Sequence, residues 1–306
     1  MPATLPRRIL GLLPALGVTV HDVAPGLAVV ARRVPVKVRR LKGGSALVLR
    51  QGAHRATSLG RGLHLVGPAG MFSQQDRATR DKAVSDWLAL QHLRDILRQY
   101  RVDVVLDVGA NKGQYATGLR KAGFEGRIIS FEPVPEVFAK LSEAAAGDEL
   151  WEVHQLGLGR SDGELEMHVV PGTMSSMLPP SQFGTDRYES LRQVTVQKVP
   201  VRRLEDFLDE VLPAGSEPPR ILLKMDTQGF DLEVFGGLGS ACDLVVAMQS
   251  EVALLTIYDH MPRMPEALSV YEGAGFEVTG MYPVSRERRT ARVLEYDCVM
   301  VRAAAL

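Results

Sequence analysis

The stretch VVLDVGANKGQYATGL, residues 104–119, decides the fold of this chain. An apolar run leads into an acid, two glycines follow four positions apart, and the sequence then takes the spacing of an amphipathic helix. A buried strand that turns on glycines into a helix is typical of α/β domains that bind a nucleotide-like ligand. Gly109 and Gly113 would let the backbone approach such a ligand, and the helix would offer it free amide groups.

The region after residue 102 alternates between short apolar segments and segments with helical periodicity. This alternation predicts a mostly parallel, doubly wound α/β sheet with right-handed crossovers. We expect strands at residues 102–106, 127–131, 152–157, 220–225, 244–249, 276–282 and 294–301. We expect helices at residues 76–100, 113–122, 134–146, 203–211, 230–238 and 263–274. The link between the last two strands is short and polar, which predicts an antiparallel C-terminal hairpin.

Residues 1–75 differ in composition from the rest of the 306-residue chain. The net charge is zero overall, but residues 1–62 hold eleven Lys and Arg and a single acid, Asp22. Short apolar segments broken by glycine and proline predict a small, basic, β-containing N-terminal extension, followed by one domain over residues 76–306. The positive charge suits either an anionic acceptor or surface, or, as we favour, packing on the acidic remainder of the chain or on a second subunit of a homo-oligomer.

The overall composition, with 45% hydrophobic and 24% charged residues, is ordinary for a soluble globular protein. No apolar run reaches the roughly 20 residues that a transmembrane helix needs, so we expect no membrane span. Cys242 and Cys298 lie in different predicted elements, which indicates neither a disulfide framework nor a zinc site and favours a cytoplasmic location. Basic and aromatic residues do not interleave as they do in nucleic-acid readers, so a nucleic-acid partner is not expected.

An acid at the end of the second predicted strand narrows the choice of ligand. Glu132 follows Gly113 by nineteen residues, and a carboxylate there can accept both hydroxyls of a ribose. Either a dinucleotide or S-adenosylmethionine would use these features. The dinucleotide pattern G-x-G-x-x-G is not matched, because Asn111 stands where its second glycine would be. The C-terminal hairpin also suits a methyltransferase better than a dehydrogenase.

Several ordered motifs in the chain resemble those of the FkbM family of S-adenosylmethionine-dependent methyltransferases. They are LDVGANKGQYATGLRKAGFEGRIISFEPVPEVFAKL from residue 106, SSMLPP from 175, LLKMDTQGFDLEVFGG from 222, MQSEVALLTIYDHMP from 248 and GAGFEV from 273. The resemblance covers about residues 80–302. It implies a class I methyltransferase (Rossmann-like) fold, S-adenosylmethionine as the cofactor, and methyl transfer to an oxygen of a sugar (a glycan acceptor) or of a small-molecule secondary metabolite.

One motif departs from the common form of the family, which has a glutamate before the glycine of K-x-D-x-x-G. This chain has Gln228 there, which argues against an obligatory acid at that position.

The glycine turn and the ends of the second and third strands would hold the cofactor. Glu132 would accept the ribose hydroxyls, Tyr115 would close over the methionine moiety, and residues 157 and 158 would flank the adenine ring. The glycines of the turn, residues 157 and 158, and Tyr115 also have a purely structural interpretation, in a turn or in the core. The expected cofactor-binding residues are Asp107, Gly109, Asn111, Gly113, Tyr115, Glu132, Gly157 and Leu158.

The motif KMDTQG supplies the candidate catalytic residues. Strand alternation puts Lys224 and Asp226 on one face at the end of a strand, beside the predicted cofactor cleft. Asp226 would act as the general base for a hydroxyl acceptor, or would bind a divalent cation that acidifies this hydroxyl. Lys224 would keep Asp226 ionised or contact the acceptor oxygen. The structural alternative is a Lys–Asp pair that caps the sheet.

Three other features have two interpretations each. Glu251 ends the next predicted strand, where it would either join Asp226 in a magnesium site or serve as a cap. His260 is either an acid–base group or, as we favour, a surface residue. The Ser/Pro/Gly-rich residues 171–190 suit a lid over the acceptor or a plain surface loop.

The methyltransferase hypothesis has two rivals. One is a nicotinamide-dependent oxidoreductase, and the other is a non-catalytic S-adenosylmethionine-binding protein, for which Gln228 is the one hint.

Overall fold

The computed structural model describes residues 18–24, 27–32, 36–40, 46–50, 53–60, 63–68, 77–212, 218–287 and 289–305. The chain forms two compact units, Met1–Asp81 and Lys82–Leu306.

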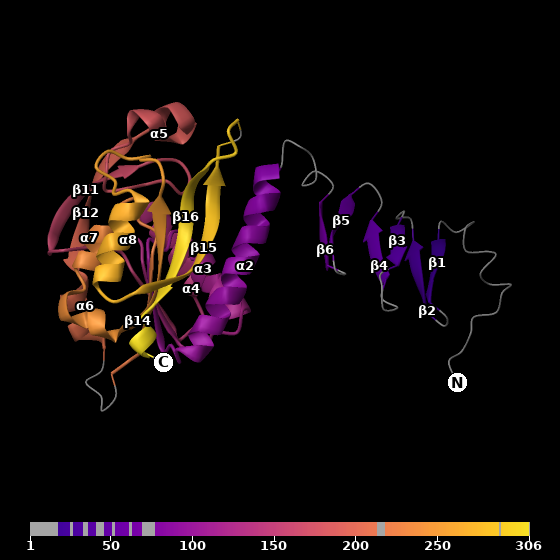
Figure 1. Cartoon of the computed structure of the whole chain (residues 1–306), viewed down its shortest axis with the longest axis horizontal. Coiled ribbons are helices and arrows are strands. Elements are labelled where there is room, and N and C mark those ends of the chain that lie inside the picture. Colours follow the sequence, from indigo (N-terminus) through magenta and orange to yellow (C-terminus); the bar gives the residue numbers. More distant parts are fainter. Residues whose placement is uncertain are drawn as a thin grey trace. The chain divides into compact units, whose positions relative to one another are not determined.

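The larger unit is built on a seven-stranded sheet of order β15-β16-β14-β13-β7-β8-β9 (Figure 1). Its strands are β7 (Val104–Val108), β8 (Arg127–Phe131), β9 (Trp151–His154), β13 (Ile221–Met225), β14 (Val245–Ala253), β15 (Glu277–Arg286) and β16 (Val293–Val301). Neighbouring strands are parallel except where β16 is involved, since it runs antiparallel to both β14 and β15. The predicted doubly wound sheet with an antiparallel C-terminal hairpin is therefore confirmed.

Helices cover both faces of this sheet (Figure 1). One face packs against α2 (Arg77–Gln99), α3 (Gln114–Lys121) and α4 (Pro135–Ala145), and the other against α6 (Leu204–Val211), α7 (Asp231–Gly236) and α8 (Met264–Gly273). Because both faces are buried, alternate residues of a central strand enter different cores: Leu106 packs on the α6 side and Val105 on the α2 side. Among the residues that the structure describes, none of the helices combines the length and apolarity needed to cross a bilayer.

A second, three-stranded sheet was not expected. It contains β10 (Gly157–Gly159), β12 (Thr195–Arg203) and β11 (Gly163–Val169) in that order. The single strand predicted at 152–157 is wrong in this respect, because β9 ends in the main sheet and β10 begins in the smaller one. β11 alternates the apolar residues Leu165, Met167 and Val169 with polar ones, which is the pattern of a strand with one buried face, so the sequence contains a signal that the prediction missed. The segment between them also contains a short helix, α5 (Gln182–Arg187).

The described residues of the smaller unit form three consecutive β-hairpins. They pair β1 (Val18–Ala24) with β2 (Leu27–Arg32), β3 (Val36–Arg40) with β4 (Ala46–Arg50), and β5 (His54–Gly60) with β6 (Leu63–Pro68). The hairpins begin 18 residues apart, and each pairs its first residue with the residue 14 positions later: Val18 with Arg32, Val36 with Arg50, and His54 with Pro68. The same length and register three times in succession define a tandem repeat. The composition predicts β-structure here, but the repeat becomes visible only in the pairing.

Candidate active site

The turn after β7 contains three residues with positive φ: Gly109 (74°), Asn111 (50°) and Gly113 (79°). A Cβ atom on residue 109 would overlap the backbone carbonyl oxygen of Asp226, so the turn lies directly against the residue that follows β13. A Cβ atom on residue 113 would lie 2.8 Å from the ring of Trp151, and packing against that ring therefore requires glycine. Glycine is thus required at positions 109 and 113 for different reasons: close approach to the Asp226 backbone at the first, and to the Trp151 ring at the second.

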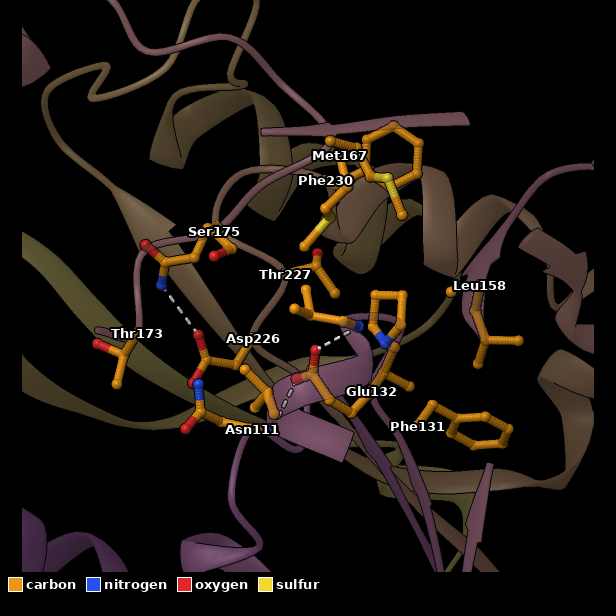
Figure 2. A pocket seen from close by; sticks show the side chains of 18 of the residues that line it. Asn111, Phe131, Glu132, Leu158, Met167, Thr173, Ser175, Asp226, Thr227 and Phe230 are labelled. Atoms are coloured by element: carbon orange, nitrogen blue, oxygen red, sulfur yellow. Dashed lines mark hydrogen bonds between the residues drawn. The ribbon is translucent and has the colours of Figure 1, made fainter. Parts of the chain in front are cut away.

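A pocket opens at the carboxyl ends of β7 and β8, where open α/β sheets bind their ligands (Figure 2). Five of the eight expected cofactor-binding residues line it: Gly109, Asn111, Glu132, Gly157 and Leu158. Asp226 lines it as well.

The two ends of this pocket differ in chemistry (Figure 2). The apolar end is lined by Phe131, Leu158, Met167 and Phe230, and the polar end by Asn111, Thr173, Ser175 and Asp226. Glu132 lies between these two groups in the view of Figure 2. The pocket therefore suits an elongated ligand with a flat apolar part, a hydroxylated middle and a charged part.

Glu132 is held rigidly by the backbone around it. Its Oε2 accepts a hydrogen bond from the amide of Asn111 (3.0 Å), and its Oε1 accepts one from the amide of Val134 (3.0 Å). Burial raises the pKa of this carboxyl, and the two amides oppose that rise. Each oxygen keeps a further lone pair, so a carboxylate fixed in this way can still accept hydrogen bonds from a ligand.

The other three expected cofactor-binding residues do not line the pocket. Asp107 is fully buried and pairs with Lys224, and Gly113 packs against Trp151. The ring of Tyr115 lies 5.2 Å from Nζ of Lys224, and its hydroxyl donates to Gln249 (3.2 Å). All three residues therefore stabilise the turn from behind and do not face the pocket.

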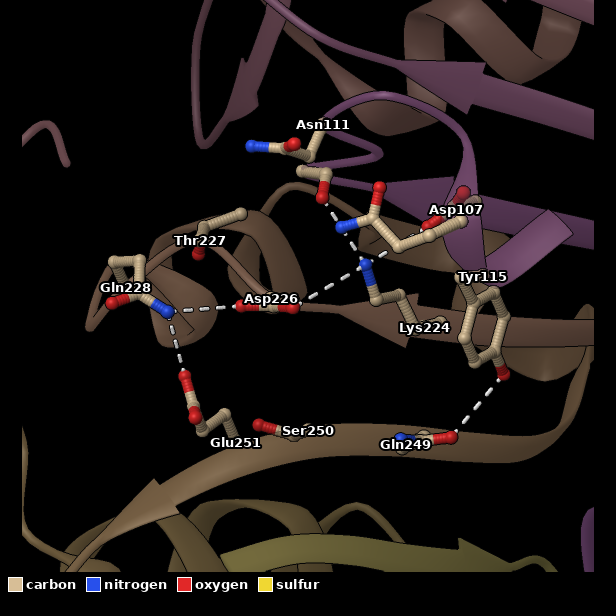
Figure 3. A network of polar contacts seen from close by, with 12 residues as sticks. Asp107, Asn111, Tyr115, Lys224, Asp226, Thr227, Gln228, Gln249, Ser250 and Glu251 are labelled. Carbon is tan, nitrogen blue, oxygen red and sulfur yellow. Dashed lines mark hydrogen bonds and ion pairs between the residues drawn. The ribbon is translucent and has the colours of Figure 1, made fainter. Parts of the chain in front are cut away.

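Lys224 is a buried cation that connects the turn to β13 (Figure 3). Its Nζ lies 2.9 Å from Oδ1 of Asp107 and 3.7 Å from Oδ2 of Asp226, and it donates to the carbonyl oxygen of Gly109 (3.2 Å). Burial acts to lower the pKa of Lys224, but the two carboxylates outweigh burial and raise this pKa above its ordinary value. Lys224 is therefore a permanent cation at neutral pH and cannot remove a proton from an acceptor.

Gln228 joins the two carboxylates that face the end of β13 and the neighbouring β14 (Figure 3). Its Nε2 donates to Asp226 (3.0 Å) and to Glu251 (2.8 Å), and its Oε1 accepts from the hydroxyl of Tyr258 (3.1 Å). A glutamate at this position would have no proton to donate and would add a third negative charge. The departure of residue 228 from the common motif therefore has a physical reason in this chain.

Gln228 and Tyr258 are missing from the residues that the sequence identifies as a site. Both stand inside motifs that carry the family resemblance, but nothing in the sequence indicates that an amide of one segment contacts a tyrosine thirty residues later. The replacement of the family's glutamate by Gln228 was a sequence signal that could have identified this residue. No sequence signal identifies Tyr258.

A magnesium ion does not fit the arrangement around Asp226 and Glu251. The amide of Gln228 donates to both carboxylates at once, where a bridging cation would have to lie. In the described part of the chain, no group of three or more His, Cys, Asp or Glu side chains could hold a metal ion.

The segment 171–190 is fixed to the site through a serine. Ser176 is fully buried, its Oγ donates to the carbonyl oxygen of Gln228 (2.7 Å), and its backbone pairs with His168 of β11. Ser175 lines the pocket itself. His260 is exposed and lies outside the pocket lining.

A doubly wound sheet that ends in an antiparallel hairpin, with a fixed carboxylate beyond its second strand, defines a class I methyltransferase. The FkbM methyltransferase domain matches residues 107–278, more than half of the chain, and the chain belongs to this family of S-adenosylmethionine-dependent methyltransferases. This membership decides against the nicotinamide-dependent oxidoreductase.

Three relatives have similar sequences. "Methyltransferase 1" of Beauveria bassiana is 27% identical over 188 residues, which are 57% of this chain and 72% of the relative. "Methyltransferase sdnD" of Sordaria araneosa is 27% identical over 209 residues, 61% of this chain and 79% of the relative. "Hexuronic acid methyltransferase AglP" of Haloferax volcanii is 26% identical over 146 residues, 47% of this chain and 53% of the relative.

Proposed function

We propose that this protein is an O-methyltransferase that transfers a methyl group to a hydroxyl of a small molecule, either a sugar (free or within a glycan) or a secondary metabolite. The observation that carries the proposal is the position of Asp226, which lines the polar end of the pocket and leaves 45% of its side chain exposed. A carboxylate that is held in place yet open to solvent is suited to accept a proton from an approaching hydroxyl.

The residues around the pocket fit S-adenosylmethionine. Glu132 would bind the ribose hydroxyls, and the apolar side chains of Leu158 and Phe131 would contact the adenine ring. Gly109 and Asn111 would border the methionine part at the other end. S-adenosylmethionine, when bound, supplies a methyl group on a positively charged sulfur.

Asp226 would act as the general base and Lys224 as its positioning residue. Nζ of Lys224 lies 3.7 Å from Oδ2 of Asp226, and Nε2 of Gln228 donates a hydrogen bond to Oδ1. These two contacts, one to each oxygen, fix the orientation of the Asp226 carboxylate. The base and the acceptor then meet without a metal ion.

The class of acceptor is supported by relatives rather than by the pocket alone. One relative is named a hexuronic acid methyltransferase, which makes a sugar a reasonable acceptor for a member of this family. The name of a second relative, "Methyltransferase 1", states no acceptor and therefore does not narrow the acceptor class.

Replacement of Glu132 by alanine should weaken the binding of S-adenosylhomocysteine. Loss of hydrogen bonds to a charged group costs about 1.5–3 kcal/mol, which corresponds to a roughly tenfold to hundredfold rise in Kd. Isothermal titration calorimetry measures this change. Glu132→Gln should lie in between, because its NH₂ group would face an amide donor of either Asn111 or Val134. Equal affinity in folded wild-type and Glu132→Ala protein would remove the ribose role, and Glu143→Gln, on the exposed side of α4, serves as the control.

We also propose that residues 76–306 form the methyltransferase domain and that the basic extension is not needed for cofactor binding. A chain without residues 1–75, which removes all three hairpins whole, should melt cooperatively and bind S-adenosylhomocysteine with the Kd of the full chain, because every pocket residue lies beyond residue 107. Calorimetry and a thermal melt check both points. Aggregation of the shortened chain would show that the extension contributes to the core.

A further inference from the structure

The segment that follows β11 has one side toward the pocket and the other toward the core. We call residues 173–178 the pocket wall. Its odd-numbered side chains line the pocket, and Figure 2 places the first two at the polar end: Thr173, Ser175 and Met177. Its even-numbered side chains are on the core side, where the first is fully buried and the other two pack against the cluster that contains Tyr258: Ser176, Met174 and Leu178. A contact on the core side of such an alternating segment can therefore fix the side chains that border the ligand.

Gln228 keeps its place with a strained backbone. Its φ of 54° lies in the left-handed region, which residues other than glycine rarely adopt. Its carbonyl oxygen accepts from Oγ of Ser176 in the pocket wall (2.7 Å), and its Nε2 donates to Asp226 and to Glu251. A strained residue whose carbonyl and side-chain amide are both engaged is held by its surroundings, and such residues gather at functional sites.

One buried hydroxyl connects the pocket wall to the side chain of Gln228. Tyr258 is fully buried, and its hydroxyl lies 2.8 Å from the carbonyl oxygen of Met174 and 3.1 Å from Oε1 of Gln228. Burial, and after it the nearby carboxylates of Glu295 and Glu251, raises the pKa of Tyr258, so the hydroxyl keeps its proton at neutral pH. The single proton of this hydroxyl therefore serves both acceptors.

The amide of Gln228 has one favourable orientation (Figure 3). If its two ends were exchanged, Oε1 would face the carboxylates of Asp226 and Glu251, to which Nε2 now donates. Acceptors that face acceptors away from water cost free energy. In the observed orientation Oε1 points to Tyr258, which supplies the donor that this oxygen needs.

We propose that Tyr258 is a positioning residue that fixes two parts of the site at once: the pocket wall, through Met174, and the Asp226 carboxylate, through Gln228. This inference rests on the proposed O-methyltransferase function and deepens it. Tyr258 does not line the pocket, so it acts through these neighbours and not by contact with the cofactor. The wall is thereby formed before the cofactor arrives, and Asp226 is held where an acceptor hydroxyl would reach it.

The variant Tyr258→Phe tests the proposal without an acceptor, because it removes the hydroxyl and keeps the ring. The full-length chain is prepared with isotope-labelled glutamine, and the NMR signals of the Gln228 side-chain amide are assigned by their absence in Gln228→Met. We expect the protons of this amide to exchange with solvent about five- to tenfold faster in Tyr258→Phe than in the wild type, because the amide loses one hydrogen bond. S-adenosylhomocysteine should bind the variant about three- to tenfold more weakly in calorimetry, since the pocket wall is no longer fixed.

The matched control is Tyr100→Phe, which should change neither value. Tyr100 is also buried, but it follows α2 and precedes the amino end of β7, at the edge of the sheet opposite to the pocket.

Three results would overturn the proposal. The first is a Gln228 amide that exchanges in the wild type as fast as that of Gln182, whose side chain is exposed. The second is a Tyr258→Phe protein in which either the exchange of this amide or the affinity for S-adenosylhomocysteine equals that of the wild type. The third is an equal effect of Tyr258→Phe and Tyr100→Phe, which would assign Tyr258 to general packing. Failure of the proposed methyltransferase function would appear separately, as a wild type that does not bind S-adenosylhomocysteine or as an Asp226→Asn variant with normal turnover.

Discussion

Methyl transfer should fall by roughly 10²–10⁴-fold when Asp226 is replaced by asparagine, the usual share of general-base catalysis. Asparagine keeps the shape of the side chain and can still accept the hydrogen bond from Gln228, but it cannot take a proton from a hydroxyl. Because the side chain is 45% exposed, the substitution should leave the fold and the S-adenosylhomocysteine affinity nearly unchanged. The measurement is kcat with any acceptor that the wild type methylates.

The control for this variant is Asp209→Asn, which makes the same change on the exposed side of α6 and should keep full activity. Chelation provides a second arm, since wild-type activity should be indifferent to EDTA if Asp226 acts without a metal ion. Near-normal turnover of Asp226→Asn would make this residue a structural cap of β13. Activity lost to EDTA and restored by magnesium would instead replace direct base catalysis by a metal site.

Replacement of Lys224 by methionine should destabilise the larger unit by about 3–5 kcal/mol, because it leaves a buried charge unpaired. Asp107 is fully buried, and without the ammonium its remaining side-chain partner among the described residues is the hydroxyl of Ser130 (3.3 Å). For a unit of this size the melting temperature should fall by roughly 6–20 °C. Thermal melts or urea titrations measure the loss.

Two further variants make this second prediction specific. Lys198→Met removes an exposed lysine of β12 and should change the melting temperature little. The double variant Asp107→Leu/Lys224→Met removes both charges and should recover a large part of the loss, as buried ion pairs replaced by apolar residues often do. A Lys224→Met protein as stable as the wild type would mean that water or a rearranged side chain satisfies Asp107.

The fold of the larger unit was predictable because its strands are buried on both faces. β7, β8 and β13 read as short apolar runs, and the predicted boundaries differ from the observed ones by two residues or fewer. β11 and β12 were missed although β11 alternates apolar Leu165, Met167 and Val169 with polar residues. Exposure is not the reason, because β15 has no fully buried residue and was predicted. The local pattern identifies a strand but does not show that β10, β11 and β12 leave the main sheet and pair with one another.

A site residue could be predicted where its position at the end of a strand decides its role. It could not be predicted where a residue distant in the sequence decides that role. Glu132 could be expected at the end of the second strand, and it borders the pocket. Asp107 stands in the same kind of position, yet a lysine 117 residues later draws its carboxylate away from the pocket. Such pairings depend on which strands become neighbours, and no local pattern contains that information.

The three hairpins near the N-terminus have a consequence for how this part of the chain can change in length. Among the described residues, each hairpin has all its strand pairing within itself, so no sheet hydrogen bonds join one repeat to the next. Loss or duplication of one 18-residue module would preserve the register of those that remain, whereas an insertion of any other size within a hairpin would shift strand against strand. The number of hairpins can therefore change without disturbing the pairing of the others, whereas the length of the paired strands cannot.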